Sequence, residues 1–143
     1  MNKNDVWFDR LHSRGFRLTK ACKAVVEIIT ESPRALTPLE VFDSARQNYP
    51  ALGLVTVYRT LEKLESLGLV QRVHQEIGCN AYLPQAKGHQ HLIICTTCGR
   101  AEYFTGDDLD FLYERVRKNF GYLVRDHWLQ LSGLCSHCQD RIE

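Results

Sequence analysis

The sequence predicts an α+β protein in which an N-terminal winged helix-turn-helix domain precedes a small β-β-α-β domain that holds a four-cysteine zinc site. Three observations predict this fold. Amphipathic helical patterns in the first half end in a cationic helix and a hairpin. Strand-forming residues in the second half surround a single helical pattern. Two Cys-x-x-Cys pairs enclose that second half, at Cys95/Cys98 and Cys135/Cys138.

Three helices are expected in the first 50 residues. The first ends at Gly15, where a left-handed cap is sterically free, and has its apolar residues at helical spacing: Val6, Trp7, Phe8 and Leu11. The second begins after Thr19 as N-cap and stops before Pro33. The third begins with a capping box, in which Thr37 is the N-cap and Glu40 reaches back to it, and runs to about Asn48.

Residues 55–68 predict a fourth, amphipathic helix that ends at a glycine cap. One narrow face carries the apolar residues Val57, Leu61 and Leu64. A face turned well away carries Thr56, Arg59 and Lys63. Residues 69–74 and 79–83 flank a turn and predict a β-hairpin directly after this helix. That order is typical of a winged helix, whose recognition helix enters the major groove of double-stranded DNA. The alternative is an ordinary solvated helix face.

A linker is expected at residues 84–88, which lack periodicity and contain Pro and Gly. It divides the chain into a DNA-binding domain of residues 1–84 and a metal-binding dimerisation domain of residues 85–143. In the second domain, strands are expected at 89–95, 100–104 and 122–131. The helix between them is expected to start at Asp107 or Asp108 and to end at Gly121. So small a domain buries little surface, which favours stapling by zinc and pairing with a second copy.

The two Cys-x-x-Cys pairs indicate a closed structural zinc site. Each pair lets two thiolates converge on one tetrahedral ion at about 2.3 Å. Disulfides are the alternative, but cysteines of one knuckle are poorly placed to pair with each other. Residues 1–5 are polar and lack the apolar run of a signal peptide, and no stretch approaches the roughly 18 apolar residues of a membrane span. We therefore expect a cytoplasmic protein, without a membrane partner, whose cysteines bind metal.

Charge supports nucleic-acid binding locally rather than globally. The net charge is only +1. The first 23 residues nevertheless hold a group of cations that only Asp5 and Asp9 oppose: Arg10, Arg14, Arg17, Lys20 and Lys23. We expect the region around Arg17, together with Lys63, to contact DNA phosphates.

The motifs together resemble the ferric uptake regulator family over roughly residues 10–138. They are Thr-Val-Tyr-Arg at 56–59, His-x-His before Cys-x-x-Cys-Gly at 89–99, and Gly-Leu-Cys-x-x-Cys at 133–138. The resemblance implies a homodimeric, metal-sensing transcriptional repressor of metal homeostasis that binds operator DNA, with a structural four-cysteine zinc and a regulatory metal at the hinge. It implies that Tyr58 and Arg59 contact DNA. It also implies that the regulatory metal is bound by His89, His91 and Glu102.

Two ligand positions of the family differ here. Iron and peroxide sensors usually have a histidine just after the second helix, where this chain has Ala35, and an acid on the second wing strand, where it has Leu83. We expect Cys79, on that strand, to fill the vacancy; a half-buried packing cysteine is the alternative. A thiolate ligand favours Zn²⁺, as the resemblance to zinc uptake regulators implies, while Fe²⁺ and Mn²⁺ remain compatible.

A further metal site of the family aligns with Asp110 and His127, but Gly88 and Gln90 replace its other usual ligands. Two functions from other classes stay open. One is a thiol- or peroxide-sensing transcriptional switch in which the cysteine-zinc centre oxidises. The other is an enzyme, since a metal-bound water could act as nucleophile. No sequence signal for a substrate groove or a catalytic base accompanies the metal ligands, so we expect no enzymatic activity.

Overall fold

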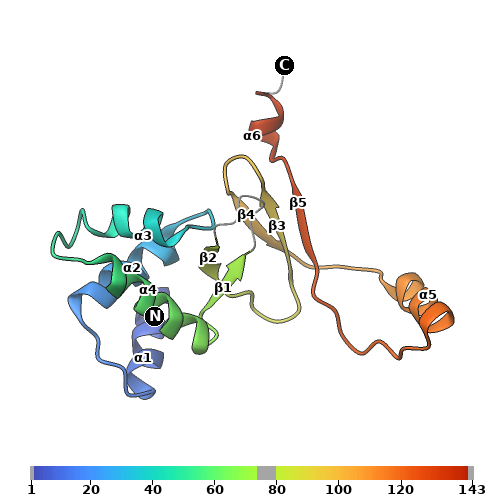
Figure 1. Ribbon diagram of the computed structural model, residues 1–143, viewed down its shortest axis with the longest axis horizontal. Helices are drawn as coiled ribbons and strands as arrows, with labels where there is room; N and C mark the ends of the chain where they lie inside the picture. Colours follow the sequence, from blue (N-terminus) through green and yellow to red (C-terminus); the bar gives the residue numbers. More distant parts are fainter. Residues whose placement is uncertain (1, 74–79, 142–143) are drawn as a thin grey trace.

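The computed structural model describes residues 2–73 and 80–141 of the 143. Helices and strands are both present, and the α+β class predicted from the sequence is confirmed. The winged-helix unit, residues 2–73 and 80–84, holds α1 (Lys3–Ser13), α2 (Lys20–Glu31), α3 (Pro38–Ala45), α4 (Leu54–Ser66), β1 (Val70–Val73) and β2 (Ala81–Pro84). The second unit, residues 85–141, holds β3 (His91–Cys95), β4 (Ala101–Phe104), α5 (Asp110–Phe120), β5 (Gln130–Gly133) and α6 (Ser136–Gln139). Figure 1 shows the two units side by side.

Helices α2 and α3 start where the sequence places their caps. The Thr19 side chain accepts from the backbone N–H of Cys22 at 3.1 Å. At α3 the capping box is complete, with Glu40 N–H donating to Thr37 at 3.2 Å and Thr37 N–H donating to Glu40 at 3.0 Å. The inward faces of all four helices form one apolar cluster, with Leu11, Val25, Val41 and Leu61 at most 1 % exposed. This packing fixes which face of α4 is left for solvent.

The hairpin predicted after α4 is present. Strands β1 and β2 pair antiparallel, from Val70 opposite Pro84 to Val73 opposite Ala81. The residues that join them, 74–79, lie outside the described part of the chain, and so does the expected ligand Cys79.

The second unit is built on a three-stranded sheet of order β4-β3-β5. Strand β3 pairs antiparallel with β4 and parallel with β5. The strand expected at 122–131 is wrong in extent, because β5 covers only Gln130–Gly133. Its parallel partner β3 begins at His91, and Leu92 already lies opposite Gln130. The residues expected to form the first part of the strand therefore lie before the start of β3 and have no residue of β3 to pair with. The predicted start of α5 also shifts, to Leu109 as N-cap, while its end at a left-handed Gly121 is confirmed.

The two units are joined by more than the chain at residues 84–88. A second apolar cluster packs Val73, Ala81 and Leu83 of the hairpin against Leu92 and Ile94 of β3. The segment between α2 and α3 also crosses over, because Ala35 N–H donates to Gly99 O at 3.0 Å and Ala101 N–H donates to Pro33 O at 3.2 Å. Strand β3 is therefore held against the wing, and the division of the chain at residue 84 stays a prediction.

Helix α5 stands apart from the rest of the chain (Figure 1). It has no buried residue, although its sequence is amphipathic. Its apolar side chains Phe111 and Phe120 are 73 % and 71 % exposed. An apolar helix face that nothing in the described part of its own chain covers is typical of an interface with another molecule. None of the described helices is both long and apolar enough to cross a membrane.

Candidate metal centres and nucleic-acid interface

The four predicted zinc ligands converge at the end of the second unit that carries α6. Cys95 is the last residue of β3 and Cys98 follows in the turn, while Cys135 caps α6 and Cys138 lies within it. Their four sulfur atoms all lie within 4.8 Å of one another. Gly99 adopts φ 75°, which lets the chain turn back from the knuckle into β4. All four cysteines are free thiols, so the geometry is that of a metal knuckle rather than of disulfides.

Electrostatics in this cluster favour a bound cation. Hydrogen bonds from the backbone N–H groups of Cys135 and Cys98 lower the pKa of Cys95 to about 6. Hydrogen bonding with the Cys135 side chain and burial instead raise the pKa of the Cys138 thiol to about 12. With the four sulfur atoms so close together, one thiolate disfavours deprotonation of the others unless a divalent ion compensates the negative charge. Four converging sulfur donors in a closed, tetrahedral-sized cluster fit Zn²⁺.

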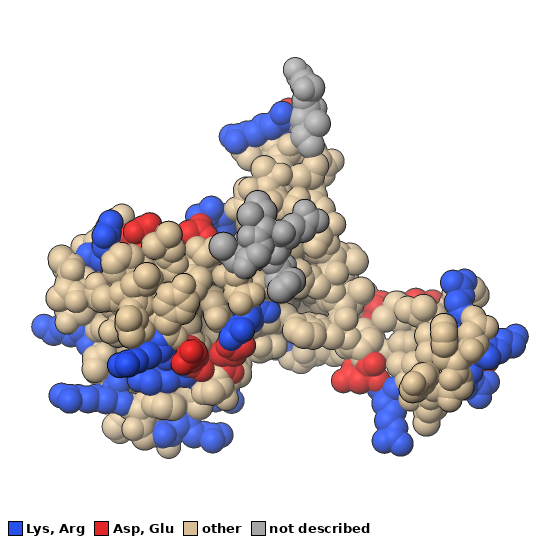
Figure 2. Space-filling model, viewed as in Figure 1, with Lys and Arg blue, Asp and Glu red and all other residues tan. Residues whose placement is uncertain are grey.

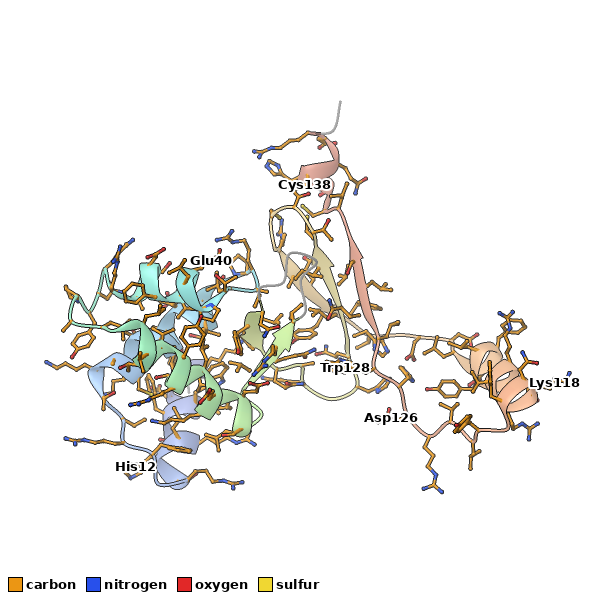
Figure 3. The ribbon with its side chains drawn as sticks, viewed as in Figure 1. His12, Glu40, Lys118, Asp126, Trp128 and Cys138 are labelled. Atoms are coloured by element: carbon orange, nitrogen blue, oxygen red, sulfur yellow. The ribbon has the colours of Figure 1, made fainter. Side chains whose placement is uncertain are left out.

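A second cluster forms at the opposite end of β3, about 13 Å away at 3.3 Å per residue. It brings together the ring nitrogens of three histidines and a carboxylate oxygen within 4.8 Å of one another: His89, His91, Asp107 and His127. The carboxylate lies at the centre, with Asp107 Oδ2 2.5 Å from His91 Nε2, 3.4 Å from His89 Nε2 and in contact with His127 Nε2. Figure 3 labels Cys138 in α6 and Asp126, the neighbour of His127, on the segment that leads back from α5.

The histidine–aspartate cluster is partly shielded from solvent. His91 is 2 % exposed and the Asp107 and His127 side chains are 18 % and 19 % exposed, whereas His89 faces solvent. Burial opposes ionisation of Asp107, but hydrogen bonds with His91, His89 and His127 outweigh it and lower the pKa of the carboxyl. Tyr113 of α5 contacts Nδ1 of His127 and so orients that ring. Three imidazoles and one carboxylate suit Zn²⁺, Fe²⁺ or Mn²⁺.

The structure brings together only part of the regulatory set expected from the sequence. His89 and His91 meet as expected. Glu102 does not join them, because it lies opposite Ile93 on β4 and lines a small cavity beside Cys95 and Cys135. Cys79 is outside the described residues. Asp110 is the first residue of α5 and is not in the cluster.

Sequence reasoning missed Asp107 and assigned no role to His127 in this cluster. Asp107 was expected to start α5, and the helix begins three residues later with no side-chain cap. Its carboxylate is therefore free to turn toward β3. The available signal was a pair of polar residues flanking the helix, Asp107 before it and His127 after it, at the ends that return to the sheet.

The exposed side of α4 presents the residues expected to meet DNA. Val57, Thr60, Leu61 and Leu64 are buried, whereas Thr56, Tyr58, Arg59 and Lys63 are exposed. Lys63 is held over the Phe16 ring, 5.6 Å from its centre, which brings it near the exposed Arg17. Figure 2 shows Lys and Arg side chains gathered along the lower edge of the winged-helix unit, over α1 and its surroundings. This side combines hydroxyl groups, aromatic edges and positive charge.

Residues 13–132 match the model of the ferric uptake regulator family. The chain belongs to this family. It is 30 % identical to the ferric uptake regulation protein of Bacillus subtilis over 98 % of this chain and 97 % of that one. It is also 30 % identical to the ferric uptake regulation protein of Legionella pneumophila, over 91 % and 96 % of the two chains.

Solved structures of the ferric uptake regulator family share the fold. The ferric uptake regulator of Helicobacter pylori superposes with a TM-score of 0.72 at 24 % identity, covering 96 % of this chain and 95 % of that one. A zinc-bound manganese uptake regulator gives 0.71 at 24 % identity, covering 89 % and 96 %. The regulator of Francisella tularensis, solved with iron, gives 0.68 at 25 % identity, covering 87 % and 96 %. Family membership makes the chain one of a group of metal-responsive transcriptional regulators.

Proposed function

We propose that this protein is a metal-responsive repressor that binds operator DNA as a homodimer when the histidine–aspartate cluster holds a divalent ion, and that it controls genes of metal homeostasis. The observation that carries the proposal is the convergence of His89, His91, Asp107 and His127 in a chain whose α4 leaves Tyr58 and Arg59 exposed. One feature supplies a sensor and the other a way to read DNA.

The four-cysteine cluster is assigned to a structural Zn²⁺ and the histidine–aspartate cluster to the regulatory ion. The donors support this division, because four sulfurs make a closed site that exchanges metal slowly, whereas His89 faces solvent. The expected preference for Zn²⁺ at the regulatory site came from Cys79, which lies outside the described residues. Without it, three imidazoles and a carboxylate accept Fe²⁺ and Mn²⁺ as well as Zn²⁺. Glu102 and Cys79 stay candidate ligands of a rearranged site.

The regulatory ion would act by fixing segments that are otherwise loosely attached. His91 lies on β3, Asp107 precedes α5 and His127 follows it. An ion bound by all three ties both flanks of α5 to the central strand. It would therefore stabilise one arrangement of the second unit over others, which is a population shift with a coupling of about 1–3 kcal/mol.

A second copy of the chain would cover the apolar surface that α5 and its flanks expose. The large side chains concerned are Phe111, Leu112, Phe120, Tyr122, Leu123 and Trp128, each at least 46 % exposed. A dimer places two recognition helices about 34 Å apart, the spacing of successive major grooves. Ordering α5 by metal would thus set the geometry with which both copies of α4 meet one operator.

Base reading is tested by comparing Arg59→Ala with Lys63→Ala on the protein's preferred duplex and on random duplex. Arg59→Ala should cost about 1–3 kcal/mol of binding free energy and relax base preference, because an arginine side chain can donate two hydrogen bonds to the O6 and N7 atoms of guanine. Lys63→Ala should weaken binding to both duplexes alike and reduce the salt dependence. Equal losses for Arg59→Ala on the two duplexes would contradict a base-reading role. Titrating protein that retains only its structural zinc with Zn²⁺, Fe²⁺, Mn²⁺ and Ni²⁺ then identifies the regulatory metal.

A thiol- or peroxide-sensing switch is the second candidate, and the lowered pKa of Cys95 favours it. A thiol with a pKa of about 6 is largely thiolate at neutral pH, and thiolates react with oxidants. Against it, Cys95 is only 5 % exposed. Measuring bound zinc and free thiols before and after mild peroxide treatment separates the two candidate functions. A metal sensor should keep its structural zinc and its free thiols, whereas a thiol switch should lose both.

A further inference from the structure

The most exposed apolar residue of α4 is Val55, and its position has no explanation in the fold. Val55 is 63 % exposed. The buried residues of α4 are Val57, Thr60, Leu61 and Leu64, and at about 100° per residue Val55 lies nearly opposite the middle of that face. It belongs to neither apolar cluster of the described residues. A β-branched residue also weakens a helix slightly relative to alanine.

The neighbours of Val55 on the surface are the residues proposed to read bases. Tyr58 and Arg59 follow it by three and four positions, so the three side chains are adjacent on one helix face. Val55 is also the second residue of α4, which begins at Leu54. In helix-turn-helix proteins the N-terminal residues of the recognition helix are the ones that contact base edges.

We propose that Val55 recognises thymine by packing its methyl groups against the C5 methyl group of that base in the major groove. Among the four bases only thymine presents a methyl group there, so an apolar side chain discriminates in its favour. The cations Arg17 and Lys63 around this face would hold the phosphates on either side, while Arg59 reads a neighbouring base. The inference rests on the proposed DNA-binding function and deepens it, because it names one base that the α4 face reads.

The expected loss of DNA affinity follows from the size of the apolar groups removed. Removing one buried methylene-sized group from an apolar contact changes affinity about fourfold. Val55→Ala removes two methyl groups and should therefore weaken binding to the preferred duplex by about fifteenfold at most. It should not weaken the fold, since the side chain is exposed and alanine is the better helix former.

The test pairs Val55→Ala with DNA in which thymine is replaced by uracil, which removes only the methyl group. A preferred duplex is first selected from random sequences with the metal-loaded wild-type protein. Each thymine is then replaced singly, and affinities are measured by fluorescence anisotropy. The wild-type protein should lose about fourfold at one thymine of each half-site, and Val55→Ala should bind the thymine and uracil duplexes equally. Val6→Ala, the same change at an exposed position of α1, should keep the wild-type preference.

Each outcome decides something. A uracil penalty that is the same in Val55→Ala as in the wild type overturns the inference, and so does a wild-type protein that shows no uracil penalty at any position. In both cases selective DNA binding, and hence the proposed function, survives. Failure to enrich any sequence in the first selection would overturn the proposed function and this inference with it.

Discussion

At the scale of single residues, spacing along the chain predicts the four-cysteine site but not the full histidine–aspartate site. Two Cys-x-x-Cys pairs carry their geometry with them, because each knuckle is local. His89 and His91 are local in the same way. Asp107 and His127 are brought to them only by how the chain leaves and rejoins the sheet around α5. No periodicity or spacing rule contains that path, so the missing ligands required the structure.

Cys98→Ser should release zinc and destabilise the second unit. So small a unit depends on the metal, because metal binding free energy is there folding free energy. Zinc content measured by atomic emission should fall, and thermal unfolding should lose its cooperative second-unit transition. His137→Ala is the matched control, since His137 is exposed between Cys135 and Cys138 and is not among the clustered ligands. An unchanged melting curve for Cys98→Ser would show that the cluster is not a structural zinc site.

Tyr103→Phe should weaken the junction between the two units by about 1 kcal/mol. The Tyr103 hydroxyl donates to Pro84 O at 2.6 Å, and burial raises its pKa from 10.0 to about 12. Because the folded pKa lies above the unfolded one, this stabilisation is fully present below pH 10 and is lost as pH rises through about 12.

Urea unfolding and tyrosine absorbance across that pH range test the role of Tyr103. The variant should lose stability at neutral pH, show a smaller further loss between pH 10 and 12, and lack the ionisation step near pH 12. Tyr58→Phe, at an exposed site, should change none of these. If Tyr103→Phe matches the wild type at neutral pH, the hydroxyl does not hold the units together.

At the scale of elements, the caps and amphipathic patterns predict the helices of the winged-helix unit well. Thr19, and Thr37 with Glu40, act locally, so their signals survive any tertiary context. The second unit is less predictable, because β5 is defined by its pairing with β3 and not by its own residues. The same is true of the segment at Ala35, which crosses to Gly99 through backbone groups that leave no mark in the sequence.

Metal binding should protect α5 from hydrogen exchange. The helix has no buried residues, and the proposed ion would tie both its flanks to β3. Exchange measured with only the structural zinc present, and again after adding the regulatory metal, should slow in residues 105–129. His127→Ala should abolish that change, whereas His12→Ala, at an exposed position of α1, should leave it intact. Metal-induced protection that persists in His127→Ala would place the ion elsewhere.

At the scale of the whole molecule, the apolar cluster between hairpin and sheet changes the expected mechanism. The sequence suggested a linker at residues 84–88 and, by its resemblance to the family, a regulatory metal at the hinge between the two domains. In the structure, Val73 and Leu83 already pack against Leu92 and Ile94. We therefore expect metal to act mainly on the position of α5 and on how the second copy of the chain docks. The β1–β2 hairpin should move together with the sheet that contains β3.

The central claim is that a second metal ion, beyond the structural zinc, raises affinity for operator DNA. The most direct measurement is the dissociation constant of the protein for its selected duplex with the four-cysteine zinc alone and after the histidine–aspartate cluster is saturated, at one fixed salt concentration. We predict that saturation tightens binding roughly 5- to 150-fold. Equal affinity in the two states would contradict metal sensing and leave a DNA-binding protein that does not respond to metal.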